Sequence, residues 1–287
     1  MRYLHFSDRG SRGIAAAEKS GAFHAIMESD ARYPGDIDHL ISLGPEALKE
    51  AGDSILKGSE IALDSVILLP PLPAPGKIIC VGLNYVDHSA ETGFEVPDYP
   101  LIFARFASTF VGAGAPIVRP RVSEQLDFEG EFVVVIGKEG RHIAKSSALD
   151  HVIAYSLFND ASIRDFQRRT PQWTVGKNFD ATGPFGPYIV TADELPPGCK
   201  GLRIQTRLNG KVMQDANTND LVFDVETLIS TLSEAFALLP GDIIVTGTAA
   251  GVGGMRKPPI WMKPGDVVEV ELEQFGILRN PVVDEIN

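Results

Sequence analysis

Three acidic side chains alternate just ahead of an apolar run in the segment LDFEGEFVVVIG, residues 126–137. The run FVVVI is rich in β-branched residues and ends at a glycine, which predicts a buried β-strand. If the strand begins at Asp127, alternation places Asp127, Glu129 and Glu131 on one face, about 7 Å apart. Like charges leading into a buried strand resist desolvation, so they require a cation or raised pKa values. A solvent-facing edge strand is the alternative.

The charge balance of the chain is acidic, because 38 acidic and 26 basic residues give a net charge of −12. A nucleic-acid or anionic-membrane surface needs a basic footprint, so neither partner is expected. The 287 residues, 44% of them hydrophobic, suffice for one large core or for a large and a small one. Arg and Lys side chains in a cleft can still attract a small anionic substrate.

The two cysteines, Cys80 and Cys199, lie far apart and outside any CxxC pattern. Reduced thiols in a cytosolic protein are therefore expected in place of a disulfide or a zinc site. No apolar segment approaches about 18 residues, and the N-terminus has no signal-peptide core. The chain is predicted to be soluble and cytoplasmic.

A proline-rich segment divides the chain. LLPPLPAPG, residues 68–76, carries four prolines and a glycine and is typical of a stiff connector. Residues 1–69 are predicted to form a small N-terminal domain with a hairpin through Ser20-Gly21 and a helical segment, DIDHLISLGPEALKEAG. Residues 70–287 contain short strands separated by Gly and Pro, which favours a mainly β body over repeated βαβ units.

The segment NYVDHSAE, residues 84–91, carries an imidazole and a carboxylate at helical spacing. If the segment is helical, His88 and Glu91 lie on one face as i and i+3. A carboxylate that holds an imidazole can set up a general base, and a surface ion pair on a helix is the alternative.

The segment DASIRDFQRR, residues 160–169, has a similar pattern. Asp160, Arg164 and Gln167 fall on one face of a predicted helix. Asp160 is suited to be the N-cap of that helix. The alternative is that Arg164 and Gln167 clamp an anion above this carboxylate, beside a metal.

Two loops contain further polar candidates. Lys177 lies in a segment rich in Gly and Pro, where a lysine is usually only solvated. The sequence IIVTGTAAGVGGMRKPP, residues 243–259, superficially resembles a phosphate loop but has no GK[ST], so a nucleotide site is not expected. Its glycines can let the backbone approach a small ligand, with Thr248 exposed to it.

Four stretches in order resemble the fumarylacetoacetate hydrolase superfamily: NYVDHSAE, LDFEGEFVVVIGK, YSLFNDASIRDFQ with GKNFDATGPFGP, and PGDIIVTGTAAGVG. The resemblance covers roughly residues 75–284, and the N-terminal unit is similar to the variable leader of bacterial members. It implies an α+β fold, in which a mixed β-sandwich roll with short flanking helices accompanies a small N-terminal α/β domain. Members commonly form homodimers.

The resemblance also implies a divalent cation, usually Mg²⁺ and sometimes Mn²⁺ or Ca²⁺. The matching ligands are Glu129, Glu131 and Asp160. Three hard oxygen ligands agree with this, because they suit Mg²⁺ or Mn²⁺ and not zinc. Asp127 is then expected to be a neighbour that hydrogen-bonds nearby, not a ligand.

The resemblance also implies roles for the remaining site residues, each at the position that matches the family motif. Members bind a 1,3-dicarbonyl or 2-oxo acid, and His88 and Glu91 match the pair that activates water in the hydrolases. Lys177 and Gln167 match residues that hold the carbonyl oxygen and the oxyanion. Arg164 matches a residue that meets the carboxylate or oxo group of the substrate.

Thr248, in TGTAAG, matches a hydroxyl that contacts the substrate. One stretch departs from the family pattern, since members often read PxxFxKP where this chain has PLIFARFAS. Arg105 therefore replaces a lysine, which leaves open how anions are contacted in that corner. Trp173, Trp261 and the RKPP segment either shape a specificity pocket or serve in packing.

On this basis we expect a metal-dependent hydrolase that cleaves a carbon–carbon bond of a β-diketo acid, such as an acylpyruvate or fumarylpyruvate. The alternative on the same metal site is decarboxylation of a β-keto acid of the oxaloacetate type, or isomerisation or hydration of a dienoate. A third reading is a silent binding protein on this fold. The intact set of site residues argues against it.

Overall fold

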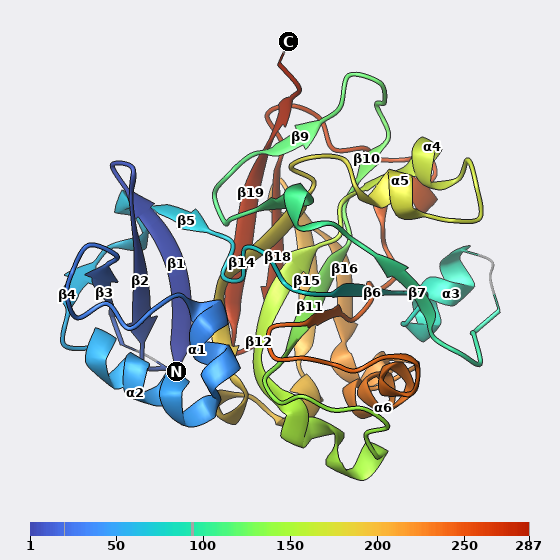
Figure 1. Cartoon of the computed structure of the whole chain (residues 1–287). Coiled ribbons are helices and arrows are strands. Elements are labelled where there is room, and N and C mark those ends of the chain that lie inside the picture. Colours follow the sequence, from blue (N-terminus) through green and yellow to red (C-terminus); the bar gives the residue numbers. More distant parts are fainter. Residues whose placement is uncertain (20, 93–94, 287) are drawn as a thin grey trace.

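The structure, a computed structural model, describes residues 1–19, 21–92 and 95–286 (Figure 1). It is built mostly of strands in sheets with short helices around them, so the fold is α+β as expected. Within the described residues the larger sheet has 12 strands. Its main path is β4 (Ser59–Ile61), β3 (Phe23–Met27), β2 (Ser11–Ala17), β1 (Arg2–Asp8), β14 (Gly183–Thr191), β12 (Val152–Asn159), β11 (Gly130–Ile136), β17 (Ile243–Val245), β6 (Ile78–Gly82) and β7 (Leu101–Ala104); β5 (Ile67–Leu69) pairs with β1, and β8 (Phe110–Val111) with β14.

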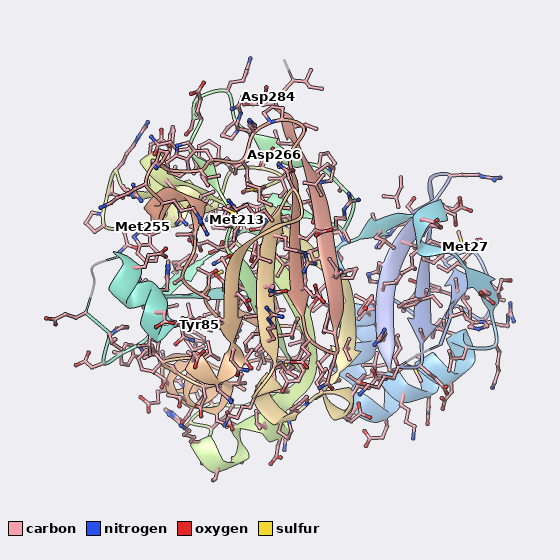
Figure 2. All side chains as sticks on the ribbon, turned by 180° about the vertical axis from the view of Figure 1, so that it is seen from behind. Met27, Tyr85, Met213, Met255, Asp266 and Asp284 are labelled. Atoms are coloured by element: carbon pink, nitrogen blue, oxygen red, sulfur yellow. The ribbon has the colours of Figure 1, made fainter. Side chains whose placement is uncertain are left out.

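A smaller sheet, five-stranded within the described chain, packs on the larger one. Its strands are β16 (Lys211–Asn217), β15 (Arg203–Leu208), β18 (Val267–Leu272), β19 (Gly276–Asp284) and β9 (Ile117–Arg119). β10 (Leu126–Asp127) and β13 (Ser162–Ile163) form a separate pair. Seen from behind, the smaller sheet covers the centre of the molecule, with α3 (Val86–Thr92) on one side and the N-terminal strands on the other (Figure 2).

β11 lies in the middle of the larger sheet, between β12 and β17. Its side chains alternate between two cores, because Phe132 and Val134 share one with Val270 of the smaller sheet, whereas Val133 and Val135 belong to another. Both faces of the strand are therefore buried, which explains the unbroken apolar run. The prediction of a buried strand here is confirmed.

The N-terminal strands extend the larger sheet, because β1 pairs with both β2 and β14. β2 and β3 form the expected hairpin, of which Ser20 lies outside the described residues. The predicted helical segment forms two helices, α1 (Ile37–Leu43) and α2 (Pro45–Ile55), which meet at Gly44. The domain boundary at residue 69 stays a prediction.

α2 and α6 (Val225–Ala235) are 11 residues long. Among the described residues, no helix combines the length and the apolar character needed to cross a membrane.

Four strand ends converge at one edge of the larger sheet. β6 and β17 are parallel neighbours, so the chain leaves both at this edge, into α3 and into a glycine-rich loop. β11 runs antiparallel to β17 and β12, so its first residues lie beside their last ones. The acidic residues at the start of β11 are thereby brought next to α3, the glycine-rich loop and the end of β12.

Candidate active site and metal centre

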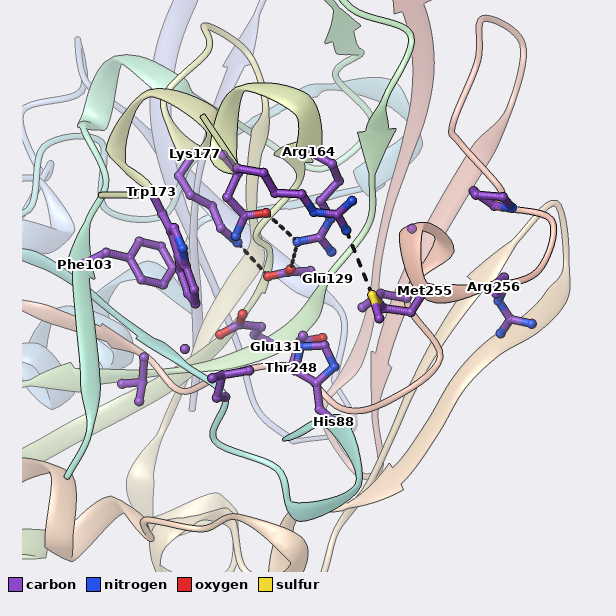
Figure 3. Close-up of a pocket in the computed structure, with 18 of the residues that line it drawn as sticks. His88, Phe103, Glu129, Glu131, Arg164, Trp173, Lys177, Thr248, Met255 and Arg256 are labelled. Carbon is purple, nitrogen blue, oxygen red and sulfur yellow. Dashed lines mark hydrogen bonds and ion pairs between the residues drawn. The ribbon is translucent and has the colours of Figure 1, made fainter. Parts of the chain in front are cut away.

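A cavity of about 610 Å³ lies at this edge (Figure 3). It is enclosed by the ends of β6 and β11, by α3, by the short helices α4 (Arg164–Gln167) and α5 (Thr174–Lys177), and by the loop after β17. Most of the predicted site residues line it: His88, Glu129, Glu131, Arg164, Gln167, Lys177 and Thr248. Asp160 and Glu91 complete the predicted set through contacts with lining residues: Asp160 pairs with Lys177, and Glu91 pairs with His88.

The three predicted metal ligands come together. Glu129, Glu131 and Asp160 are buried, and each offers a carboxylate oxygen within 4.8 Å of the others. Strand pairing explains this proximity, because Gly130 is opposite Asn159 and the Asp160 N–H donates to the Glu129 carbonyl at 2.8 Å. The ladder between β11 and β12 thus fixes the third carboxylate beside the first two.

The three carboxylates differ in their cationic partners. Lys177 Nζ lies 2.7 Å from Glu129 and 2.6 Å from Asp160, and Arg164 Nη1 lies 2.6 Å from Glu129. Burial alone would raise the pKa of Glu129, but Lys177 and Arg164 outweigh it and lower the pKa to about 2. Glu131 instead accepts one backbone N–H, from Gly247 at 2.5 Å.

Burial and the neighbouring carboxylates of Asp160 and Glu129 raise the pKa of Glu131 well above its usual range. A buried carboxylate in this position is stable in its charged form only with an additional cation. The donor set is three hard oxygens, which fits Mg²⁺, Mn²⁺ or Ca²⁺. These residues are therefore able to hold the divalent cation that the resemblance implies.

Asp127 lies apart from this cluster, because the acidic alternation is interrupted: β10 ends at Asp127 and β11 begins at Gly130. The expectation that all three acidic side chains share one face of one strand is therefore wrong. The Asp127 carboxylate accepts the N–H groups of Gly253 and Gly254 at 2.8 and 2.9 Å, and Arg164 Nε at 2.8 Å. It fastens the glycine-rich loop to α4, which agrees with the expected role of a hydrogen-bonding neighbour.

The predicted helix over residues 160–167 begins later than expected. α4 begins at Arg164 with Ile163 as its N-cap, so Asp160 is neither on the helix nor its cap. The chain before α4 instead pairs as β13 with β10, which overrides the helical spacing. Arg164 and Gln167 do share the helix and touch, with Nη1 donating to Oε1 at 2.9 Å.

Arg164 keeps one buried donor for a ligand. Its Nε and Nη1 are used by Asp127, Glu129 and Gln167. Its Nη2 is buried and has no hydrogen-bond acceptor among the described residues, although the side chain lines the cavity. A buried N–H without an acceptor is costly, so this atom is suited to receive an anionic oxygen.

His88 and Glu91 are on α3 and face each other, with His88 Nδ1 and Glu91 Oε2 separated by 3.4 Å. The Glu91 carboxylate also accepts the Gly251 N–H at 3.0 and 3.1 Å, which ties α3 to the glycine-rich loop. Figure 3 shows His88 across the cavity from Lys177 and Arg164. The arrangement can present an oriented imidazole to a bound ligand.

Thr248 lines the cavity, but its hydroxyl already bonds within the protein. It donates to the Gly130 carbonyl at 3.0 Å and accepts from Gln214 Nε2 at 2.8 Å. Gln214 also accepts the Gly130 N–H at 3.0 Å and donates to the Ala249 carbonyl at 2.7 Å. Gln214 therefore links β11 by hydrogen bonds to the loop that carries Thr248. No sequence pattern indicates this role for Gln214, which lies within β16.

Arg105 occupies the corner where the chain departs from the family pattern. It is 3% exposed and ion-paired with Asp160, and its Nη2 donates to Thr182 Oγ1 at 2.8 Å. Its guanidinium also lies 5.3 Å from the ring centre of Phe158. Arg105 therefore stabilises the charged form of the Asp160 carboxylate.

One wall of the cavity is aromatic. Trp173 and Phe103 line it in edge-to-face contact, with ring centres 5.5 Å apart, and Lys177 Nζ lies 5.0 Å from the centre of Phe103. Trp173 thus belongs to the pocket, as do Arg256 and Lys257 of the RKPP segment. Arg168 also lines the cavity, and sequence reasoning did not single it out.

Comparison with known proteins identifies the family. Residues 77–283 match the family model described as "Fumarylacetoacetate (FAA) hydrolase C-terminal". The chain is 44% identical over 289 residues to "Oxaloacetate tautomerase fahd2, mitochondrial" of Xenopus laevis, covering 99% of this chain and 90% of that protein. It is 45% identical over 220 residues to "Oxaloacetate tautomerase FAHD2A, mitochondrial" of Homo sapiens, covering 76% and 70%.

Among solved structures, the chain is similar to a fumarylacetoacetate hydrolase from Exiguobacterium antarcticum, with a TM-score of 0.87 and 35% identity over 99% of this chain and 100% of that one. The sequence motifs, the buried carboxylates and these similarities agree with one another. The chain belongs to the fumarylacetoacetate hydrolase family.

Proposed function

We propose that the protein is a divalent-metal-dependent enzyme that interconverts the keto and enol forms of oxaloacetate. The observation that carries this proposal is the 44% identity, over 99% of the chain, to a protein named as an oxaloacetate tautomerase. It favours the alternative expectation, which was a decarboxylase of an oxaloacetate-type β-keto acid or a dienoate isomerase or hydratase on the same metal site, over the carbon–carbon hydrolysis that we expected first.

Keto–enol interconversion moves one proton between C3 and the C2 oxygen, so it needs a base, a proton donor and stabilisation of the negative charge between them. A divalent cation held by Glu129, Glu131 and Asp160 would supply a Lewis acid for the oxygens of the 2-oxo acid. In the keto-to-enol direction the His88 imidazole, oriented by Glu91, removes the C3 proton, and the imidazolium so formed donates it to the C2 oxygen; the reverse reaction runs the same two transfers backwards. A C–H bond breaks and an O–H bond forms, and no water is consumed.

Two cationic side chains are placed to bind and stabilise the substrate. Arg164 offers its unpaired Nη2 to the C1 carboxylate. Lys177, held between Glu129 and Asp160, places an ammonium beside the carboxylates, where it stabilises negative charge on the C2 oxygen. The low dielectric of the buried site strengthens both interactions.

Hydrolysis of an acylpyruvate is a second candidate, and the His88–Glu91 pair favours it. A base oriented by a carboxylate can activate water as well as remove a proton from carbon. The cavity of about 610 Å³, with Phe103 and Trp173 on one wall, has room for an apolar acyl group.

The test is a comparison of three reactions catalysed by the purified protein with Mg²⁺ or Mn²⁺. Loss of the ultraviolet absorbance of enol-oxaloacetate reports tautomerisation, carbon dioxide reports decarboxylation, and pyruvate with acetate from acetylpyruvate reports hydrolysis. We expect metal-dependent acceleration of the first reaction, abolished by EDTA. Acceleration of hydrolysis alone would overturn the proposal in favour of the second candidate.

A homodimer and a cytoplasmic location stay predictions. Light scattering of the purified protein tests the first, and cell fractionation tests the second.

A further inference from the structure

The mouth of the cavity is cationic in a chain whose net charge is −12. Arg168, Arg256 and Lys257 all line it. Among the described residues, none of the three forms an ion pair with a carboxylate, whereas Arg203 and Arg207 on the smaller sheet do so at 2.5 to 2.9 Å. Cations without a carboxylate partner at the opening of a pocket indicate a site for an anionic group of the ligand.

Arg168 is the member of this set whose guanidinium is most available. The only hydrogen bond of its guanidinium to the described residues is from Nη2 to the Met255 sulfur at 3.9 Å, and a thioether is a weak acceptor. Met255 belongs to the loop after β17, so the contact joins the end of α4 to that loop, and both residues line the cavity. The planar fork of the guanidinium is thereby left for a carboxylate.

Arg256 is committed to the backbone instead. Its Nη2 donates to the Met213 carbonyl at 2.6 Å and to the Gly251 carbonyl at 3.0 Å, and its Nε donates to Gly251 at 3.2 Å. Figure 3 places it beyond Met255, away from Glu129. Arg256 therefore shapes the loop, and Lys257 beside it, which is exposed like Arg168, has no planar fork to bind a carboxylate with two hydrogen bonds.

Arg168 is also connected through the backbone to the inner part of the site. Its backbone N–H donates to the Arg164 carbonyl at 3.1 Å, so it continues the turn of α4 that presents Arg164 and Gln167. The same short segment thus offers one arginine to the inner end of a bound anion and another to its outer end. A ligand with two carboxylates matches this arrangement, in which one cavity-lining arginine is buried and the other is exposed.

We propose that Arg168 is a specificity-determining residue that binds the distal carboxylate of a dicarboxylic 2-oxo acid, while the C1 carboxylate lies at Arg164 and the buried carboxylate cluster. The proposal rests on the proposed function and adds to it the group that selects dicarboxylates over monocarboxylates. An uncharged group at the distal end would leave Arg168 without a partner.

The test compares Arg168→Gln with a matched control, Arg169→Gln. Arg169 is the next residue and is also exposed, but its guanidinium stacks on Phe166 at 3.6 Å and does not line the cavity. Both variants remove one positive charge from the same turn. Kinetics are measured with oxaloacetate and with its 4-methyl ester, which differs in the distal charge.

We expect Arg168→Gln to raise KM for oxaloacetate roughly 10- to 100-fold with little change in kcat, the range for loss of a charge-assisted bidentate contact. KM for the methyl ester should stay within about twofold, Arg169→Gln should resemble the wild type with both substrates, and Arg168→Lys should restore part of the affinity. Equal effects of the two glutamine variants on oxaloacetate, or an equal loss with both substrates, would overturn the inference.

Calorimetric binding of the same two compounds separates this inference from the proposed function. If the protein does not accelerate tautomerisation but prefers the free acid over the ester, and Arg168→Gln abolishes that preference, the proposed function fails and the inference holds. If wild-type protein binds acid and ester equally, the inference fails whatever the catalytic result.

Discussion

Among the three clustered carboxylates, Glu131 has the weakest local compensation. Glu129 and Asp160 are each in contact with two cationic side chains, whereas Glu131 accepts one backbone N–H. Replacing it with glutamine therefore removes a metal ligand and, in the metal-free protein, a group whose charged form burial and the neighbouring carboxylates disfavour. Stability and metal affinity are expected to move in opposite directions.

We accordingly predict that Glu131→Gln abolishes the metal-induced rise in melting temperature. Metal binds the native state and not the unfolded chain, so saturating Mn²⁺ should raise the Tm of the wild type. The variant should lack this rise, while its metal-free Tm should equal or exceed that of the wild type. Differential scanning calorimetry with and without Mn²⁺ measures both quantities, and a variant with an unchanged Mn²⁺ response would remove Glu131 from the ligand set.

A second prediction concerns the role of the His88 imidazole as the base. His88→Ala should lower kcat for the proposed tautomerisation by roughly 10²-fold or more, the usual contribution of a general base. Calorimetric affinity for Mn²⁺ should not change, because the imidazole is not among the clustered carboxylate ligands. Asp87→Ala is the control, since Asp87 is the exposed neighbour of His88 on α3. Full activity of the His88 variant would assign the base to another residue.

The residues that the sequence identified are those whose chemical type is unusual in its local context. An ExE pair at the start of a buried strand, and a His three residues before a Glu, are visible without a structure. Arg105 was noticed only because it departs from the family pattern, and Arg168 and Gln214 are common residue types in ordinary segments. Their roles arise from partners such as Asp160, Met255 and Gly130, which tertiary structure brings together.

At the scale of elements, local sequence patterns account for the features that neighbouring residues determine. The Asn209-Gly210 pair forms the turn between β15 and β16, where both residues have positive φ angles of 53° and 76°. The prediction failed where tertiary pairing decides, since β13 replaced the first turn of the expected helix at residues 160–163. The break between β10 and β11 is equally invisible in the alternating sequence.

The contact between α4 and α5 depends on a glycine. A Cβ added to Gly176 would lie 2.3 Å from the Gln167 backbone nitrogen, which the packing does not permit without a shift. Gly176 precedes Lys177, so α5 and its ammonium would be displaced from the carboxylates. The glycine therefore sets the position of a site residue through the approach of two short helices.

Gly176→Ala should consequently destabilise the protein by about 1–3 kcal/mol, the usual cost of overpacking, and lower kcat. Val175→Ala is a suitable control, because Val175 is 61% exposed in the same helix. Urea unfolding and the tautomerase assay give the two readouts. An alanine variant with normal stability and normal kcat would show that the helices can separate without disturbing Lys177.

At the scale of the whole molecule, the N-terminal unit is joined to the body through the pairing of β1 with β14, and within the unit buried polar groups join β1 to α1. His5 of β1 is 1% exposed, and its Nε2 accepts the Ile37 N–H at 3.2 Å at the start of α1. Burial lowers the pKa of His5 to about 4, although nearby Asp36 opposes this. Asp38 on α1 has the opposite shift, because burial and Asp36 raise its pKa to about 6.

These two shifts predict opposing effects of acid on stability. Below pH 6.5 the unfolded chain protonates His5 and the folded protein does not, so this group lowers the free energy of unfolding by up to about 3 kcal/mol as the pH falls towards 4. The folded protein protonates Asp38 below about pH 6, before the unfolded chain does, so this group raises the free energy of unfolding in nearly the same interval. The wild type should therefore show only a moderate net loss of stability.

Single substitutions should separate the two contributions. Asp38→Asn removes the stabilising protonation, so its Tm should fall more steeply between pH 7 and pH 4.5 than that of the wild type. His5→Gln retains an acceptor near the position of Nε2 but cannot be protonated, so its Tm should fall less steeply. His39→Gln, at an exposed position of α1, should follow the wild type. Parallel pH profiles for all four proteins would mean that the packing of β1 against α1 does not couple to the titration of either group.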